Sequence, residues 1–157
     1  MPAPRFLADE MLGTLARWLR MLGYDTEYVR DLLDREVLEL ARAEDRIILT
    51  RDRQLAERAG NTGLLITGDD LDDQLEQVVR TFALSNERSM TRCTVCNGRL
   101  VLADPQEVAE KVPERVLAFR KEFYLCPRCG QIYWKGTHWD DIKRRIGRVL
   151  TAGSSPR

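Results

Sequence analysis

The chain has 157 residues, a length that predicts about one domain, or a small domain with a smaller appendage. Hydrophobic residues make up 43% of the chain and charged residues 32%, and 25 basic side chains balance 25 acidic ones. This balance excludes a disordered, highly charged tail protein, because disorder requires low hydrophobicity together with a large net charge.

The sequence also argues against a secretory leader and a membrane span. Asp9 and Glu10 follow the N-terminus before any apolar leader region can form. The longest uncharged stretch, residues 59–68, is ten residues long, whereas a helix that crosses a bilayer needs about 20. We therefore expect a soluble, cytoplasmic protein.

The zero net charge hides two regions of opposite charge. Residues 1–90 carry 12 basic and 18 acidic side chains, whereas residues 91–157 carry 13 basic and 7 acidic ones. All four lysines and all four cysteines lie in the second region. The division predicts two functional pieces, an acidic one suited to cations and a basic one suited to polyanions such as nucleic acid.

The first 84 residues alternate short apolar runs with helical patterns. The apolar runs predict strands at residues 5–8, 26–29, 47–50 and 64–67. The helical patterns cover residues 12–22, 34–41, 51–60 and 71–82. Gly23 is a typical stop after the first of these helices. Strands that alternate with helices indicate βαβ units, so we expect an α/β domain with a parallel sheet.

The rest of the chain has few apolar residues for its length. Residues 85–92 are polar and predict a linker, so we place a domain at residues 1–88 and a smaller one at residues 89–157. The smaller domain ends in a predicted basic helix over residues 140–150, and we expect the chain to fray from Thr151 onward.

Two C-x-x-C pairs lie in the smaller domain, Cys93 with Cys96 and Cys126 with Cys129. Disulfides are disfavoured in a cytoplasmic chain, and a redox motif of the thioredoxin kind would open a helix of a βαβ unit, which neither pair does. Four thiolates instead suit tetrahedral zinc. We therefore predict one structural Zn²⁺, which closes a segment too small to fold on its own core.

Acidic residues follow the predicted strands. Asp9 follows the first strand, Asp52 the third, and Asp69 and Asp70 the fourth, while Asp34 begins a helix. Because the carboxyl ends of parallel strands share one edge of a sheet, these carboxylates can gather there and hold a hard cation such as Mg²⁺ or Mn²⁺. The alternative is that Asp9, Asp34 and Asp52 are only helix caps, and the pattern alone leaves both interpretations open.

Several motifs resemble one known family. Residues 6–25 read FLADEMLGTLARWLRMLGYD, residues 48–52 read ILTRD, and residues 132–139 read IYWKGTHW. Together with the two C-x-x-C pairs, and in this order, they closely resemble the PIN-like RNases of the Mut-seven C-terminal class. The resemblance covers nearly the whole chain and implies a PIN-like parallel-sheet domain followed by a small zinc ribbon with four cysteine ligands.

The same resemblance implies a metal-dependent ribonuclease. Asp9, Asp34 and Asp52 match the acidic positions of the family, and Asp9 and Asp52 would hold the catalytic Mg²⁺ or Mn²⁺. Glu36 stands two residues after Asp34 and is the alternative for that position. A fourth acid would be Asp69 or Asp70.

Basic and aromatic residues are candidates for contacts with RNA, in single strands or structured loops. They lie on the first helix, in the aromatic segment and on the basic helix: Arg17, Arg20, Tyr133, Trp134, Lys135, His138, Trp139, Lys143 and Arg144. Alternative roles remain open, because the arginines can pair with surface carboxylates and the aromatics can cover the zinc site. Trp18, at helical spacing from Leu15 and Leu22, is expected in the core, and the alternative is a platform on which a base stacks.

We therefore predict an enzyme that hydrolyses RNA phosphodiester bonds, with RNA held partly by the zinc ribbon. A carboxylate-held cation would polarise the scissile phosphate and lower the pKa of the attacking water. Two other classes of function are kept open by the sequence: a nucleic-acid-binding protein without catalysis, and the toxin component of a toxin–antitoxin pair.

Overall fold

The computed structural model describes the backbone of residues 2–154, and all side chains in that range except those of His138 and of residues 152–154. Its first half contains a four-stranded sheet formed by β1 (Phe6–Ala8), β2 (Thr26–Tyr28), β3 (Ile47–Thr50) and β4 (Gly63–Leu65). The strand order is β2-β1-β3-β4 and every pairing is parallel, which confirms the predicted α/β fold class.

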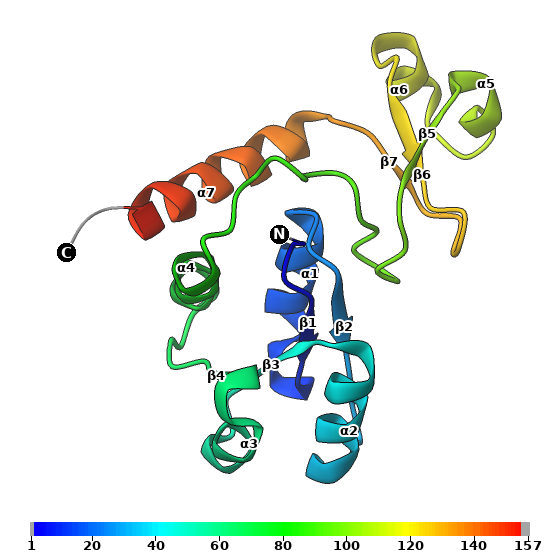
Figure 1. Cartoon of the computed structure of the whole chain (residues 1–157). Coiled ribbons are helices and arrows are strands. Elements are labelled where there is room, and N and C mark those ends of the chain that lie inside the picture. The colour runs from blue at the N-terminus through cyan, green and yellow to red at the C-terminus, as the bar shows by residue number, and fades with distance from the viewer. Residues whose placement is uncertain (1, 155–157) are drawn as a thin grey trace.

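Helices cover both faces of the sheet (Figure 1). They are α1 (Gly13–Met21), preceded by the 3-10 turn η1 (Glu10–Leu12), then α2 (Asp34–Glu44), α3 (Arg53–Ala59) and α4 (Leu71–Phe82). A second 3-10 turn, η2 (Gly60–Thr62), leads into β4. α1 and α4 pack on the face that carries Phe6 and Leu49, and α2 and α3 on the face that carries Leu7 and Ile48. Burial on both faces explains why the strands are apolar runs rather than alternating patterns.

The second half forms a smaller antiparallel sheet. Its strands β5 (Val101–Ala103), β6 (Phe123–Leu125) and β7 (Ile132–Tyr133) lie in the order β5-β6-β7. Two short helices, α5 (Pro105–Val108) and α6 (Glu114–Phe119), fill the segment between the two cysteine pairs. They enclose a small core around the fully buried Phe123. The long spacing between the pairs is therefore folded, which the sequence pattern did not predict.

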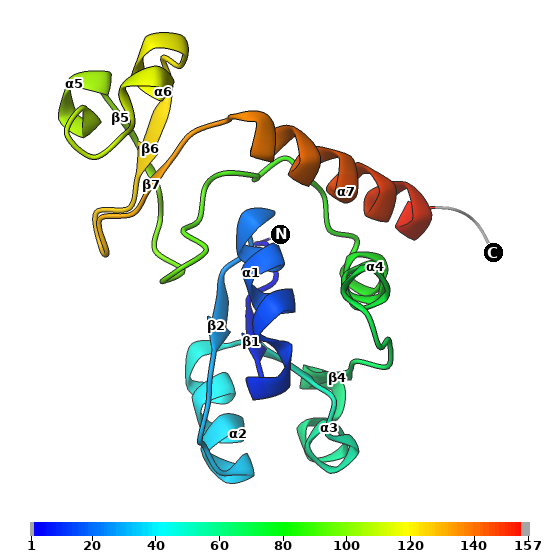
Figure 2. The same cartoon turned by 180° about the vertical axis from the view of Figure 1, so that it is seen from behind.

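The last helix, α7 (Thr137–Ser154), returns to the first half of the chain (Figure 2). It packs against α4, and its buried Ile146 and Val149 belong to the same apolar cluster as Leu75 and Val78 of α4. The helix continues to Ser154, three residues beyond the expected start of fraying at Thr151, and residues 155–157 lie outside the described part of the chain. With the proposed domain boundary near residue 88, α7 belongs to the second domain in sequence but packs in the core of the first.

The first cysteine pair is attached to the edge of the parallel sheet. Asn97, which is buried and has a φ of 69°, accepts a hydrogen bond from the Thr26 N–H at 3.0 Å and donates one to the Asp25 carboxylate at 2.7 Å. From α1, Arg20 donates to the carbonyl of Thr26 at 2.8 Å and to that of Thr94 at 3.0 Å. The bonds from Asn97 and Arg20 pair the backbone N–H and C=O of Thr26, which would otherwise be unpaired at the outer edge of β2.

Among the helices of residues 2–154, none combines the length and the apolar character that a membrane crossing requires.

A glycine permits the close contact between α1 and the segment after α4. Gly23 ends α1 with a φ of 95°, and a Cβ atom built there would lie 2.0 Å from the carbonyl oxygen of Arg88. Both the backbone conformation and the space therefore require glycine.

We expect Gly23→Ala to lower the free energy of unfolding by more than about 2 kcal/mol, because it adds backbone strain to a steric clash. Gly147→Ala is the matched control, since Gly147 is helical and a Cβ there meets no atom within 4 Å. Helix propensity predicts that the control is neutral or stabilising by up to about 1 kcal/mol. Urea denaturation measures both variants, and equal stability losses would contradict the assignment.

Asp25 is the centre of an ion-pair network beside Asn97. Its carboxylate lies 2.7 Å from Arg46 Nη1, 3.3 Å from Arg5 Nε and 3.7 Å from Arg92 Nη2. Burial alone would raise the pKa of Asp25, but hydrogen bonds from Asn97 and Arg46 and the charges of Arg46 and Arg92 outweigh it and lower the pKa to about 2.

This lowered pKa predicts a loss of stability in acid. Asp25 stabilises the fold fully above the pKa of an unfolded aspartate, about 3.9, and its contribution is lost as the pH falls through about 2. We expect a decrease of about 2 kcal/mol in the free energy of unfolding between about pH 4 and pH 2. Asp25→Asn should lack this part of the pH dependence, as measured by urea denaturation across that range; identical pH profiles for both proteins would be the contrary result.

Candidate active site and zinc site

Asp9 lies at the carboxyl end of β1, at the edge where the parallel strands end. Its Oδ1 accepts from the N–H of Glu10 at 2.8 Å, which caps the 3-10 turn η1. Its Oδ2 accepts from the hydroxyl of Thr50 at 3.0 Å. The main chain of Asp9 also continues the ladder, because its N–H donates to the carbonyl of Leu49 at 3.0 Å. The carboxylate is therefore held by groups from two neighbouring strand ends.

Thr50 joins Asp9 to Asp52. The Thr50 side chain is fully buried, and its hydroxyl accepts a hydrogen bond from the Asp52 N–H at 2.9 Å while it donates to Asp9. Asp52 is exposed and caps α3, because its Oδ1 accepts from the N–H groups of Gln54 and Leu55 at 2.9 and 3.3 Å. Capping uses one carboxylate oxygen, and Oδ2 has no hydrogen-bond partner among the described residues. Asp52 can thus cap a helix and also offer an oxygen to a ligand.

Asp34 does not cap α2, which is the structural role that the sequence suggested for it. Asp34 is the first helical residue of α2, and Leu33 occupies the cap position with extended backbone. The Asp34 carboxylate lies 3.7 Å from Nη1 of Arg58 on α3, an ion pair between two partly exposed side chains. Glu36 accepts from the Leu33 N–H at 3.3 Å and so closes the start of the helix. An N-terminal position on α2 places both acids beside the carboxyl edge of the sheet.

Asp69 and Asp70 follow β4 at the same edge. Asp70 caps α4 by accepting from the Asp73 N–H at 2.9 Å. Asp69 is 97% exposed and lies 3.1 Å from Nη2 of Arg51. Arg51 also donates to the carbonyl of Gly68, so it connects the end of β3 with the loop after β4. Both acids therefore have partners that organise the edge.

The four cysteines form a tighter cluster than these acids. Within the described part of the chain, they are the one group of three or more His, Cys, Asp or Glu side chains whose ligand atoms all lie within 4.8 Å of one another. The carboxylates of Asp9, Asp34 and Asp52 therefore lie at one edge of the sheet, but their oxygens do not all lie within 4.8 Å of one another. A magnesium ion is commonly held by only one or two carboxylates together with water, so two of these acids suffice as a donor set.

The cysteine cluster has the donors and spacing of a tetrahedral zinc site. Sγ of Cys93 lies 3.6 Å from Sγ of Cys129, and Sγ of Cys96 lies 3.4 Å from Sγ of Cys126. Four sulfurs at about 2.3 Å from a central zinc would be about 3.8 Å apart. Four cysteines placed to bind one metal ion are consistent with the predicted structural zinc.

Tyr133 supports the cysteine cluster. Its hydroxyl lies 3.1 Å from Sγ of Cys93 and accepts from the Thr94 N–H at 3.0 Å. Burial would raise the pKa of Cys93, but the hydrogen bond with Tyr133 and nearby N–H groups outweigh it and lower the pKa to about 7. The thiolate, which is the form that binds metal, is thus favoured at Cys93, whereas burial and the neighbouring cysteines raise the pKa of Cys96 to about 12. Tyr133 thus contacts the four-cysteine cluster, in agreement with one of the two roles that the sequence left open for it.

Arg20, a predicted RNA contact, has a different role. It is 7% exposed, and its guanidinium is committed to carbonyls of Thr26, Thr94 and Val95. These bonds join α1, β2 and the first cysteine pair, so a contact of Arg20 with phosphate is contradicted by its burial. Arg17, on the same helix, is exposed.

The remaining predicted RNA contacts lie on the ribbon and α7. Trp134 is half-buried against Phe123, with ring centroids 6.3 Å apart, and Nζ of Lys135 lies 5.8 Å from the ring centroid of Trp139. Lys143 and Arg144 are exposed on α7, where Arg144 pairs with Asp141. The side chain of His138 lies outside the described residues.

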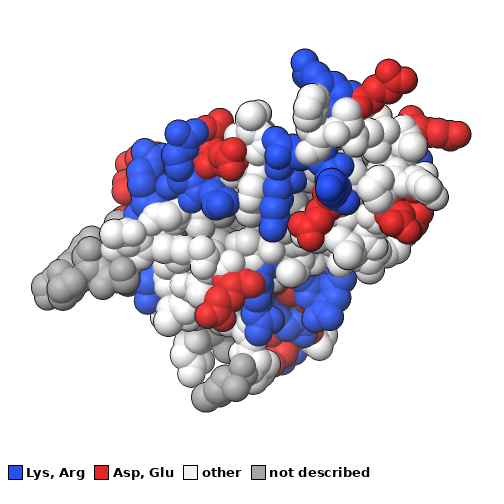
Figure 3. All heavy atoms as spheres, turned by 90° about the horizontal axis from the view of Figure 1, so that it is seen from above, with Lys and Arg blue, Asp and Glu red and all other residues white. Residues whose placement is uncertain are grey.

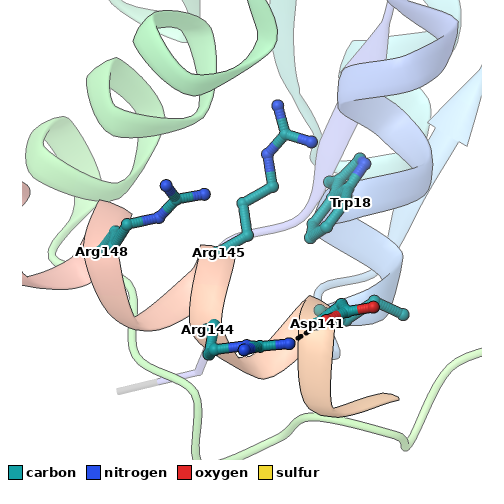
Figure 4. A pocket seen from close by; sticks show the side chains of 6 residues that line it. Trp18, Asp141, Arg144, Arg145 and Arg148 are labelled. Atoms are coloured by element: carbon teal, nitrogen blue, oxygen red, sulfur yellow. Dashed lines mark hydrogen bonds and ion pairs between the residues drawn. The ribbon is translucent and has the colours of Figure 1, made fainter. Parts of the chain in front are cut away.

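A basic pocket lies between α7 and α1 (Figure 4). It has a volume of about 700 Å³ and is lined by Trp18, Asp141, Ile142, Arg144, Arg145 and Arg148. The guanidinium of Arg145 lies 5.2 Å from the centroid of the Trp18 ring and 2.6 Å from the Asp72 carboxylate. Trp18 packs against the main core, as the sequence predicted. Seen from above, this side of the molecule carries several groups of Lys and Arg with Asp and Glu among them (Figure 3).

Three residues that organise the sites were not predicted from the sequence: Thr50, Asn97 and Arg51. Thr50 ends an apolar strand, and a buried hydroxyl directly before an Arg-Asp pair is the signal that points to it. Asn97 follows the first cysteine pair, and Arg51 precedes Asp52. The partners of Asn97 and Arg51 are distant in sequence, so local patterns carry no sign of their contacts.

Removal of the metal tests the zinc assignment. We expect one zinc per purified chain by elemental analysis, and Cys126→Ser should lose it and unfold the β5–β7 sheet. Because Asn97 is held between Cys93 and Thr26, the Thr26 amide should exchange with deuterium faster in the variant. A metal-free wild-type protein with an intact ribbon would contradict the assignment, as would unchanged protection of Thr26.

Comparison with known proteins places the chain in a family. A family model described as the Mut7-C RNAse domain matches residues 4–146, which include both cysteine pairs, the acidic edge and most of α7. No curated protein and no solved structure matches the chain. The match covers far more than half of the sequence and agrees with the α/β sheet and the four-cysteine cluster. The chain belongs to the Mut7-C RNAse domain family.

Proposed function

We propose that the protein is a divalent-metal-dependent ribonuclease whose active site is the edge where β1 and β3 end. The observation that carries the proposal is the buried hydroxyl of Thr50, which holds the carboxylate of Asp9 and the main chain of Asp52 side by side. Membership of an RNase domain family supports RNA as the substrate. Hydrolysis of a phosphodiester bond is the reaction that acidic metal sites of this kind support.

The donor set at this edge fits Mg²⁺ or Mn²⁺ by its chemistry. Asp9 and Asp52 would hold the ion with carboxylate oxygens, and Asp34 stands nearby on α2. When bound, such an ion supplies charge that polarises the scissile phosphate and lowers the pKa of water. The edge is kept acidic by three further side chains, those of Glu36, Asp69 and Asp70.

The chain's own residues position these donors before substrate binds. Thr50 restrains Oδ2 of Asp9, while the Glu10 N–H restrains Oδ1. The first N–H groups of α3 fix Asp52 through Oδ1. Preorganised donors lose little freedom when a charged substrate arrives, which is where such sites gain rate.

An acidic edge repels RNA, so affinity must come from elsewhere in the chain. Residues 91–157 carry the excess of basic side chains, and exposed Lys135, Lys143 and Arg17 lie on the ribbon, α7 and α1. Contacts between such residues and phosphates release counterions and supply binding energy that does not depend on sequence. We propose that these regions hold the RNA while the acidic edge cleaves it.

One observation favours a second function, a nucleic-acid-binding protein without catalysis. Asp9 and Asp52 both cap helical turns, which is a sufficient structural reason for an aspartate at each position. Divalent-metal-dependent cleavage by the purified protein separates the two functions, because a binding protein would retain RNA and leave it intact.

Substitution of the two acids tests the proposal. Asp52→Asn and Asp9→Asn should each lower the rate of RNA cleavage by about a hundredfold or more, equivalent to about 2.7 kcal/mol of transition-state stabilisation. Asparagine retains helix capping, so the fold should be preserved. The rate is measured with a labelled single-stranded RNA in Mg²⁺ or Mn²⁺.

A matched control separates capping from catalysis. Asp104 is an exposed N-cap of α5 in the ribbon, and Asp104→Asn should leave the cleavage rate unchanged. Thr50→Ser should retain most of the activity, whereas Thr50→Val should lose it because the hydroxyl that joins Asp9 to Asp52 is gone. If Asp52→Asn stays within about tenfold of the wild type, Asp52 is only a cap and the proposed site is wrong.

A further inference from the structure

A groove lies where α1 meets the ribbon and the start of α7. It has a volume of about 480 Å³, within the roughly 300–1,000 Å³ of pockets that bind small organic groups. Its walls carry both arginines and aromatic rings: Arg17, Arg92, Arg115, Tyr133, Trp134 and Trp139. Guanidinium groups and aromatic rings together are the surface that proteins use for the phosphates and bases of single-stranded nucleic acid.

Two of these arginines carry charge that is not neutralised within the described chain. Arg17 and Arg115 are exposed and make no ion pair with a described carboxylate. Arg92, by contrast, lies 3.7 Å from Asp25 and donates to the carbonyl of Asn97 at 3.1 Å. The groove therefore combines one structural arginine with two that are available to an anion.

The aromatic walls are held in place by the ribbon. Trp134 packs edge to face against the buried Phe123, and the hydroxyl of Tyr133 is bonded at the cysteine cluster. Trp139, on the first turn of α7, is partly buried with Lys135 nearby. A fixed aromatic wall binds a base at low entropic cost, and each stacked base contributes about 1–3 kcal/mol.

The groove and the acidic edge lie at opposite ends of α1. Asp9 directly precedes η1 and α1, whereas Met21, the last residue of α1, lines the groove together with Met90, whose N–H donates to the Met21 carbonyl. Three residues of 3-10 helix and nine of α-helix span about 20 Å. Figures 1 and 2 show the same separation, with the ribbon beyond the C-terminal end of α1 and the start of α1 at the other end of the sheet.

We propose that this groove is an anchoring site for single-stranded RNA, separate from the site of cleavage. A base lies against the indole rings, and flanking phosphates contact Arg17 and Arg115. The inference rests on the proposed ribonuclease function, because it defines the substrate as a strand that reaches from the groove to Asp9. In a base-stacked strand, with a rise of about 3.4 Å per nucleotide, a span of about 20 Å corresponds to about six nucleotides.

Binding of RNA in the groove is tested by the fluorescence anisotropy of labelled RNA mixed with the full chain, in the absence of divalent metal. The probes are a 12-nucleotide oligoadenylate and an RNA duplex of 12 base pairs. We expect Trp139→Ala and Arg17→Ala each to weaken binding of the single strand about tenfold, and Trp139→Tyr to restore most of it. Phe119→Ala and Arg42→Ala are matched controls, since Phe119 is 78% exposed on α6 and Arg42 is exposed on α2, both outside the groove.

The required length of the RNA is tested by the rate of cleavage of oligoadenylates, whose bases stack, at lengths of 3 to 14 nucleotides. The wild type should show a steep rise of at least tenfold at about six to eight nucleotides, and Trp139→Ala should flatten this rise. A rate that does not depend on length, or equal losses for Trp139→Ala and Phe119→Ala, would overturn the anchoring site, as would tighter binding of the duplex than of the single strand.

The two proposals fail in different ways. If no oligonucleotide is cleaved in Mg²⁺ or Mn²⁺ but the single strand binds with the expected dependence on Trp139 and Arg17, the ribonuclease proposal is wrong and the groove remains an RNA site. If cleavage requires Asp52 but neither Trp139 nor Arg17 affects binding, the active site stands and the groove is not an anchor.

Discussion

A parallel sheet has two chemically different edges, and the arrangement of this protein depends on that constraint. All four strands point the same way, so Asp9, Thr50 and the loop before Asp70 meet at one edge. The helix that follows β1 must run back to the opposite edge before β2 can pair with β1. Arg20, at the far end of that helix, therefore reaches the zinc ribbon while Asp9 stays at the acidic edge.

The ribbon and the sheet are joined by polar contacts and by a shared core. Asn97 and Arg20 connect the first cysteine pair to β2, and Asp25 holds the arginines around that junction. α7 then crosses back, and Ile146 is buried in the same cluster as Leu75. Buried hydrogen bonds of this kind are costly to leave unpaired, so the geometry of the junction is fixed. A metal bound by the four cysteines would thereby stabilise the edge of the sheet as well.

The sequence was enough to predict the parallel sheet and its helices, because burial on both faces gives apolar runs such as Ile47–Thr50 that stand out locally. It was not enough for α5 and α6, which are short and have little apolar pattern. It identified Asp9 and Asp52 but not Thr50, whose role comes from a contact across two strands. The burial of Arg20 likewise follows from partners more than 70 residues away.

The proposed ribonuclease activity requires that the carboxylates at the ends of β1 and β3 hold a catalytic divalent ion. The most direct measurement is anomalous diffraction from crystals of the protein soaked in Mn²⁺ with zinc retained in the ribbon. We expect a manganese peak in contact with carboxylate oxygens of Asp9 and Asp52, distinct from a zinc peak among the four cysteines. Manganese bound only elsewhere, with Asp9 and Asp52 engaged solely in helix capping, would contradict it.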